Sequence, residues 1–346
     1  MTALTQDGRA LTTSGGIAVA NLNAQIDGLT ARLHSAGSTR AAVAVLTAAA
    51  LTPLVDLLLL RGQVLGRISD YERAAGLAEA LVREAPDDGA AWLARARTQA
   101  TMHCFAQALA DLDAAGRRGA DRAALDTERA AILQAVGRCA EALALRRTAV
   151  ARRPDFTTLG ALAVLQAERG LVTEAERLFT EARRGYRSVS PFPIADLDFR
   201  RGLMWHGRGQ LRAARVWFGA AVRRLPAHAP ALGHLAEVDA ALGAHGPAID
   251  RLRPLTVSSD DPDYVATLAG VLRSTGRPQE AELWRVTAAA RYHELVDRHP
   301  EAFAHHAAGF WLTVGGDRSA GLRLLELDRA SRRAAATSLQ RAAPAR

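Results

Sequence analysis

The stretch RGLMWHGRGQLRAARVWFGAAVRRLP, residues 201–226, contains the pattern on which the fold prediction rests. Gly209 lies in its middle, with the small residue Gly202 before it and Ala214 after it. Glycine has no Cβ and takes the positive φ that ends a helix, so Gly209 separates two helical segments. Ala214 and Ala221 fall on one face of the second segment, and Pro226 ends that segment because proline has no N–H to donate. The stretch therefore predicts two short helices that pack closely through small residues.

The same spacing recurs along the chain and predicts an array of repeats. Glycine returns at intervals close to 34 residues, at Gly137, Gly170, Gly209, Gly243, Gly276 and Gly315. Nine repeats share an alanine at the position of Ala214: Ala42, Ala74, Ala108, Ala142, Ala175, Ala214, Ala248, Ala281 and Ala320. Eight of them have a small residue twelve positions earlier: Gly62, Ala96, Ala130, Ala163, Gly202, Ala236, Ala269 and Ala308. A pair of short helices cannot bury its apolar face alone, so such repeats are expected to stack.

These residues resemble the tetratricopeptide repeat (TPR) family, whose repeat has Trp, Gly, Ala, a large apolar residue, Ala and Pro at fixed positions. Residues 195–228 match with Gly202, Trp205, Gly209, Ala214, Phe218, Ala221 and Pro226, and residues 89–122 match with Trp92, Ala96, Ala108, Leu112 and Ala115. The resemblance implies an all-α fold, a right-handed α-solenoid of TPR-like helical hairpins over residues 17–333. The predicted repeats start near residues 23, 55, 89, 123, 156, 195, 229, 262 and 301.

Segments outside the repeat pattern lead to further expectations. Residues 1–16 are rich in Thr, Ser and Gly and are predicted to be disordered, and residues 334–346 are predicted to be a frayed tail. Two insertions, 187–194 and 291–300, lengthen the repeats that contain them. Each insertion is either a tolerated extension, as a loop and an overlong helix, or a bend or extra contact surface.

Composition excludes several classes of chemistry. The chain has no lysine, so its 44 basic residues are all arginine, and Schiff-base enzymes and lysine-containing phosphate loops are excluded. Cys104 and Cys139 are too few for a disulfide framework or a cysteine zinc site, and they favour a reducing, cytoplasmic location. The first residues lack the pattern of a secretory signal. Ala41–Leu60 is apolar, but Asp56 would cost about 2.5–3.5 kcal/mol in a membrane, so we predict two helices meeting at Pro53 and no membrane span.

In the TPR resemblance, the first helix of each repeat lines a concave groove. The register predicts a groove with small and neutral residues at its centre, at Thr157, Gly160 and Val164, which leaves room for a partner. The candidate binding residues elsewhere in the groove are Arg97, Gln134, Phe199, His206, Glu237 and Arg273. TPR domains that hold the terminal carboxylate of a peptide do so with Lys and Asn, which these positions lack. Arg97 and Arg273 could each bind a carboxylate with two hydrogen bonds, but they lie far apart in register.

Arginine doublets close four of the predicted second helices: Arg117 and Arg118, Arg152 and Arg153, Arg183 and Arg184, and Arg223 and Arg224. Cations stabilise the carboxyl end of a helix, which explains these doublets structurally. Stacked repeats would also align them into a basic ridge for an acidic partner, and the net charge of +8 favours such partners. Nucleic acid is the less favoured partner because no aromatic interleaving accompanies the arginines.

No motif for catalysis, for a cofactor or for a metal is present. There is no GxSxG, no GxGxxG after a strand and no HExxH, and His293, His299, His305 and His306 have no spacing that specifies a metal site. We therefore predict a non-enzymatic scaffold or adaptor, without a cofactor, that binds a protein or peptide in its groove. The alternative is a binder of acidic protein or nucleic acid through the arginine ridge. The identity of the partner and the oligomeric state do not follow from the sequence.

Overall fold

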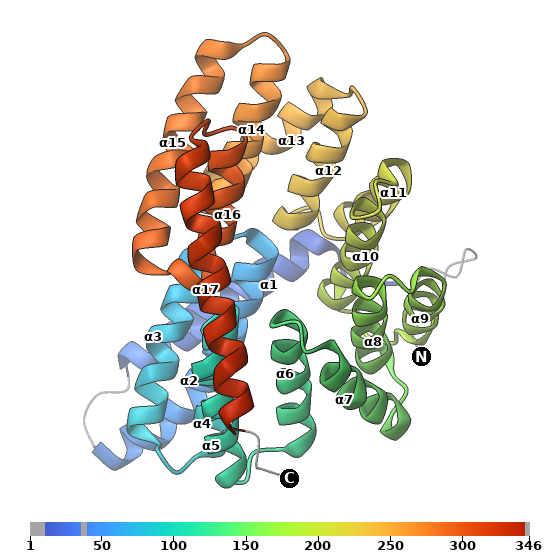
Figure 1. Ribbon diagram of the computed structural model, residues 1–346. Coiled ribbons are helices and arrows are strands. Elements are labelled where there is room, and N and C mark those ends of the chain that lie inside the picture. Colours follow the sequence, from blue (N-terminus) through green and yellow to red (C-terminus); the bar gives the residue numbers. More distant parts are fainter. Residues whose placement is uncertain (1–10, 36–39, 343–346) are drawn as a thin grey trace. The chain divides into compact units, whose positions relative to one another are not determined.

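The protein is all-helical in the part of the chain that the structure describes (Figure 1). This computed structural model describes the backbone of residues 11–35 and 40–342 and the side chains of residues 11–34 and 51–333. The helices are α1 (Gly15–Ser35), α2 (Arg40–Leu65), α3 (Ile68–Glu84), α4 (Gly89–Thr101), α5 (Phe105–Arg117), α6 (Arg122–Ala135), α7 (Cys139–Arg152), α8 (Phe156–Glu168), α9 (Val172–Gly185), α10 (Pro191–His206), α11 (Leu211–Arg224), α12 (Ala229–Ala241), α13 (His245–Ser258), α14 (Pro262–Ser274), α15 (Pro278–Arg298), α16 (Pro300–Leu312) and α17 (Arg318–Ala342). The predicted fold class, an all-α solenoid of TPR-like hairpins, is confirmed.

Consecutive helices pack as hairpins, including α4 with α5, α8 with α9, α10 with α11 and α14 with α15. Most of the first helices begin within one residue of the predicted repeat starts. Helix α10 begins four residues before the predicted start at 195, because Pro191 and Pro193 of the 187–194 insertion lie in its first turn. The fixed φ of proline suits that turn, where an N–H has no helical partner to lose.

The repeated alanines and glycines lie where the hairpins approach most closely. Ala142, Ala175 and Ala214 each have 0% of their surface exposed. A Cβ built on Gly202 would lie 2.5 Å from ring carbons of Phe218, so no larger residue fits there without a shift. The close packing through small residues that the sequence predicts is therefore confirmed.

The glycines between the two helices of a repeat have the positive φ that was predicted. Gly137, Gly209 and Gly243 have φ values of 81°, 70° and 85°. His103 occupies the same position in its repeat with φ 57°, which is uncommon for a residue with a Cβ. In the last repeat the positive φ falls on Gly316, one residue after the glycine that we identified.

The first repeat differs from the prediction. Helix α2 runs without interruption from Arg40 to Leu65 with Pro53 inside it, so the two helices predicted to meet at Pro53 are one. The side chains of Leu54, Val55 and Leu58 are completely buried. Their burial offsets the cost of a proline within a helix. No helix in the described ranges is long and apolar enough to cross a membrane.

Both ends of the chain are more ordered than predicted where the structure describes them. The N–H of Thr13 donates to the carbonyl of Val189 at 2.8 Å, and α1 already begins at Gly15. Residues 11–16, predicted to be disordered, are therefore held in place, while 1–10 lie outside the described residues. Helix α17 continues to Ala342, which replaces most of the predicted tail; residues 343–346 also lie outside the described part.

The chain divides into two compact units, in place of the single continuous domain expected. The boundaries fall between Gln25 and Ile26, between Glu128 and Arg129, and between Ala248 and Ile249. Unit 1 contains the chain up to Gln25 together with Arg129–Ala248, and unit 2 contains Ile26–Glu128 together with the chain from Ile249 onward.

Each unit joins segments that are distant in the sequence. In unit 2, the carboxylate of Asp260 accepts hydrogen bonds from the N–H groups of Ile68 and Ser69 at the start of α3. The extension of α15 by the second insertion brings His299 against Glu72, with 2.9 Å between Nε2 and Oε1. A solenoid in which each repeat contacts only its neighbours has no such contacts.

Candidate binding groove

Two adjoining cavities in unit 1 form a groove along the first helices of consecutive repeats, α6, α8 and α10. Their volumes are about 660 and 600 Å³, and both are lined by Val164, Glu168 and Arg200. We call these two cavities together the groove. A volume of this size is typical of sites that bind small molecules or peptide side chains.

The local sequence around Asp155 determines where α8 begins, and the start of this helix lies at the groove. The carboxylate of Asp155 accepts hydrogen bonds from the N–H groups of Thr157 and Thr158 at 3.1 and 3.0 Å. The hydroxyl of Thr158 in turn accepts from the N–H of Asp155, which completes a capping box. Helix α8 therefore starts at Phe156, and this start places Phe156 and Thr157 at the groove.

Small residues line part of the groove. Gly160, Ala161 and Val164 line it from α8, and Leu197 lines it from α10. A Cβ on Gly160 would come within 3.0 Å of Leu197, so the glycine keeps this part of the groove open. Thr157, Gly160 and Val164 are the residues that the register placed at the centre of the groove.

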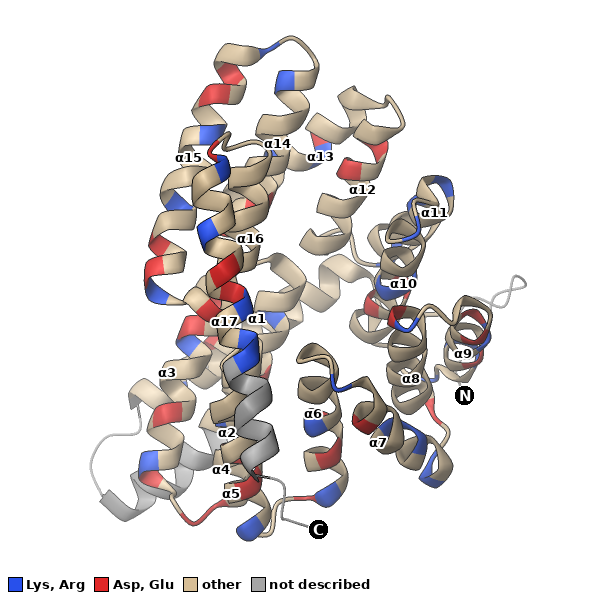
Figure 2. Cartoon of the chain, in the orientation of Figure 1, with Lys and Arg blue, Asp and Glu red and all other residues tan. Residues whose placement is uncertain are grey.

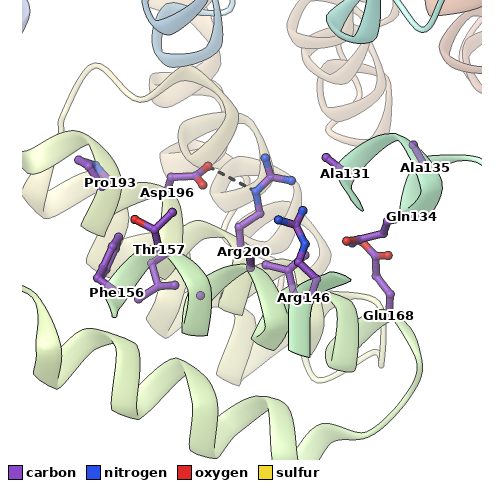
Figure 3. Close-up of a pocket in the computed structure, with 14 residues that line it drawn as sticks. Ala131, Gln134, Ala135, Arg146, Phe156, Thr157, Glu168, Pro193, Asp196 and Arg200 are labelled. Carbon is purple, nitrogen blue, oxygen red and sulfur yellow. Dashed lines mark hydrogen bonds and ion pairs between the residues drawn. The ribbon is translucent and has the colours of Figure 1, made fainter. Parts of the chain in front are cut away.

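Two guanidinium groups enter the larger of the two cavities (Figure 3). In the view of Figure 3, the heads of Arg146 and Arg200 lie in the middle of the pocket, Phe156 and Pro193 lie on one side, and Gln134 and Glu168 on the other. Arg200 donates to Asp196 over 3.4 Å, and 42% of its side chain stays exposed. A guanidinium group is able to bind a carboxylate with two parallel hydrogen bonds.

Comparison with known proteins gives matches at the level of structure alone. No protein-family model and no curated protein matches the sequence. The human IFIT1 dimer with m7Gppp-AAAA is 16% identical in sequence, and the match covers 90% of this chain and 77% of that chain with a TM-score of 0.57. The human IFIT1 dimer with PPP-AAAA is also 16% identical and covers 83% of this chain and 72% of that chain, with a TM-score of 0.55. A tetratricopeptide repeat protein from Parabacteroides merdae is 14% identical over 82% of this chain and 99% of that chain, with a TM-score of 0.45.

The chain has the fold of these IFIT1 structures, an array of TPR-like helical hairpins. The hairpins, their buried alanines and the positive-φ glycines are those that the TPR resemblance implied, and the first helices of the TPR repeats line the groove.

Of the six binding residues predicted on the TPR register, Gln134 lines the groove. Phe199 is instead a core residue, with 7% of its surface exposed and its ring 5.7 Å from that of Phe218. His206 and Glu237 meet through His234, whose ring lies 5.7 Å from that of His206 and whose Nδ1 lies 2.8 Å from the Glu237 carboxylate. The structure therefore brings Phe199, His206 and Glu237 together beside the groove, and none of them lines its cavities.

The other two candidates, Arg97 and Arg273, belong to unit 2. Arg97 donates to Glu128 at 2.8 Å and to Asp56 at 3.3 Å. Arg273 donates to the carbonyl of Val314 at 3.1 Å. The guanidinium groups that enter the groove belong to other residues than these two.

The groove residues that were not predicted from the sequence are Arg146, Arg200 and Arg208. Arg146 stands where TPR repeats have a large apolar residue, and this departure from the pattern is the signal that could have identified it. Arg200 is the residue after Phe199 on α10. A predicted register that is wrong by one residue therefore places Phe199 in the groove instead of Arg200. Arg208 donates to the carbonyl of Gly170 at 2.8 Å across the second cavity.

The arginine doublets share one arrangement. In each doublet one side chain bonds to its own unit: Arg118 to the carbonyl of Pro86 (2.6 Å), Arg153 to Asp155 (3.1 Å), Arg183 to Asp198, and Arg224 to the hydroxyl of Thr12 (3.2 Å). The other side chain is exposed in all four: Arg117, Arg152, Arg184 and Arg223. Figure 2 shows acidic positions interspersed with basic ones along the described helices.

The carboxy-terminal histidines take part in separate contacts in unit 2. His306 lies 2.9 Å from Asp263, His305 lies 3.5 Å from Asp328, and the ring of His293 lies 5.3 Å from that of Trp311. Within the described residues no group of three His, Cys, Asp or Glu side chains is arranged to hold a metal ion.

Proposed function

We propose that this chain is a non-catalytic scaffold that binds an extended segment of a partner protein in the groove of unit 1. The observation that carries the proposal is the continuity of the two cavities along α6, α8 and α10. A groove that crosses successive helices suits a peptide chain, whose side chains occupy neighbouring pockets.

We infer the chemistry of the bound segment from the lining of the groove. Phe156 and Leu197 offer apolar surface next to the guanidinium groups of Arg146 and Arg200. We therefore expect a segment that carries an acidic side chain and, close to it, a large apolar one. The acidic group gives orientation through two parallel hydrogen bonds, and the apolar group contributes most of the affinity.

The experiment that tests the proposal places a photo-crosslinking amino acid at Thr157 in the cells that produce the protein. Thr157 is exposed and lines the groove, and Thr148, exposed on α7 outside the lining, serves as the matched control. We expect a protein that crosslinks from position 157 and not from position 148, with the crosslink in an acidic segment. Crosslinks that are the same from both positions would contradict groove binding.

The second candidate function is binding of an acidic protein or a nucleic acid through the exposed arginines. The net charge of +8 supports it. The likeness to human IFIT1, solved with PPP-AAAA and m7Gppp-AAAA, supports nucleic acid as the ligand in this case. Binding through the ridge would fall steeply with salt and would weaken in an Arg152→Gln, Arg153→Gln double variant. Binding in the groove would fall less steeply with salt and would not weaken in the double variant.

A further inference from the structure

Unit 1 has another cavity, whose lining shares no residue with the groove. It has a volume of about 370 Å³ and lies between residues 11–15 and the carboxyl ends of α9 and α11. The hydroxyl-bearing residues Thr12, Thr13 and Ser14 line it on one side. On the other side it is lined by Arg183, Arg223 and Arg224.

The amino-terminal segment is fixed against this cavity by specific contacts. The N–H of Thr13 donates to Val189, and Arg224 donates to the hydroxyl of Thr12 over 3.2 Å. A Cβ on Gly15 would lie 2.7 Å from the carbonyl oxygen of Arg224, so only glycine allows this approach. The hydroxyl groups therefore have defined positions relative to the arginines.

The charges that line the cavity are all of one sign. Among the described residues that line it there are three guanidinium groups and no carboxylate. Asp198, which pairs with Arg183, is 2% exposed on its side chain and is not part of the lining. Arg223 is exposed, and its guanidinium is available to a ligand from solvent. Helix α1 starts at Gly15 at this cavity, and the partial positive charge of its first turn adds to theirs.

We propose that this cavity binds the phosphate group of a small phosphorylated molecule. A phosphate dianion offers oxygens to several guanidinium groups at once and accepts hydrogen bonds from hydroxyl groups, so it suits the arginine and hydroxyl side chains that line the cavity. The volume is at the lower end of the range for small-ligand sites, which favours a ligand that is little larger than the phosphate group itself. This inference concerns a different cavity from the groove and does not depend on the proposed function.

Calorimetric titration of the full chain tests the proposal. The probes are inorganic phosphate and inorganic pyrophosphate, with acetate as a carboxylate control, all at the same ionic strength so that general screening is constant. Arg223→Gln removes one exposed guanidinium of the cavity. Arg212→Gln removes an exposed arginine at the start of α11, outside the lining of the cavity, as the matched control. Both side chains are on the surface, so both variants keep the fold.

We expect saturable binding of phosphate or pyrophosphate that weakens at least about fivefold in Arg223→Gln and stays within about twofold in Arg212→Gln. Binding should be partly recovered in Arg223→Lys, since lysine keeps the positive charge but cannot donate two parallel hydrogen bonds. The proposal is overturned if neither phosphate probe binds, or if Arg223→Gln and Arg212→Gln bind phosphate equally well. Acetate binding as tight as phosphate binding would also overturn the assignment to phosphate.

Discussion

The ring of Phe218 lies where a side chain at Gly202 would have to be, with 2.5 Å between a Cβ built on the glycine and the nearest ring carbons. Gly202 belongs to α10 and Phe218 to α11, so this contact sets how closely the two helices of one TPR repeat approach. Phe218 is fully buried and cannot move aside into solvent.

Gly202→Ala is therefore expected to destabilise the protein by about 1–3 kcal/mol, because it overpacks a contact that has no spare volume. Gly76→Ala is the matched control. Gly76 lies exposed within α3, and a Cβ there meets nothing within 4 Å. That change should stabilise the protein by about 0.5–1 kcal/mol through helix propensity. Denaturant unfolding measures both, and a Gly202→Ala variant as stable as the wild type would contradict the close packing.

Asp260 connects distant parts of unit 2, since its carboxylate caps α3 from 191 residues away at Ser69, over 3.0 Å. Asp260→Ala should cost about 1 kcal/mol, as the loss of a helix cap does, and Asp260→Asn should cost less because the amide keeps an acceptor. Thermal unfolding gives the stability, and hydrogen exchange at the amides of Ile68 and Ser69 reports the contact itself. Unchanged exchange in Asp260→Ala would show that other groups hold this contact.

The stability of unit 1 should depend on pH through His228. This residue is 2% exposed, and its Nδ1 accepts a hydrogen bond from the N–H of Ala231 over 3.1 Å. Burial lowers the pKa of His228 from its ordinary value of 6.5 to about 4. The unfolded chain therefore binds this proton more readily than the folded one. Stability should be full above pH 6.5 and should fall by about 3 kcal/mol as the pH decreases to 4.

His228→Asn separates this effect from other titrations. Asparagine keeps an acceptor at the start of α12 and does not titrate, so the fall between pH 6.5 and 4 should be smaller in the variant than in the wild type. Urea unfolding at a series of pH values measures the difference. If the two pH profiles are parallel, folding does not lower the pKa of His228 and the prediction is wrong.

The sequence predicted the repeats well, because small residues are required wherever two helices approach. Gly209 and Ala214 mark the turn and the contact directly, and similar pairs mark most other repeats. The prediction for the first repeat was wrong because a proline normally ends a helix. The buried apolar side chains around Pro53 keep α2 continuous.

The groove was predictable in part, because the register of the repeats also gives the residues that face it. The register placed Gln134, Thr157, Gly160 and Val164 correctly, since α6 and α8 begin where expected. On α10 it placed Phe199 in the groove where the structure has Arg200. The insertion moved the start of α10 by four residues, and the ring of Phe199 gains more from burial against Phe218 than from facing solvent. Contacts between the first and last thirds of the chain leave no periodic signal, so the division into two units could not be predicted.

We propose that the groove of unit 1 holds the partner. The most direct test of this proposal is the affinity of the segment identified by crosslinking, as a synthetic peptide, for Val164→Trp and Val216→Trp variants. Val164 lies where the two cavities meet, and Val216 is 60% exposed on α11 outside their lining. We expect Val164→Trp to weaken binding at least about tenfold by filling the groove, and Val216→Trp to stay within about twofold of the wild type. Equal affinity of the peptide for Val164→Trp and the wild type would contradict binding in the groove.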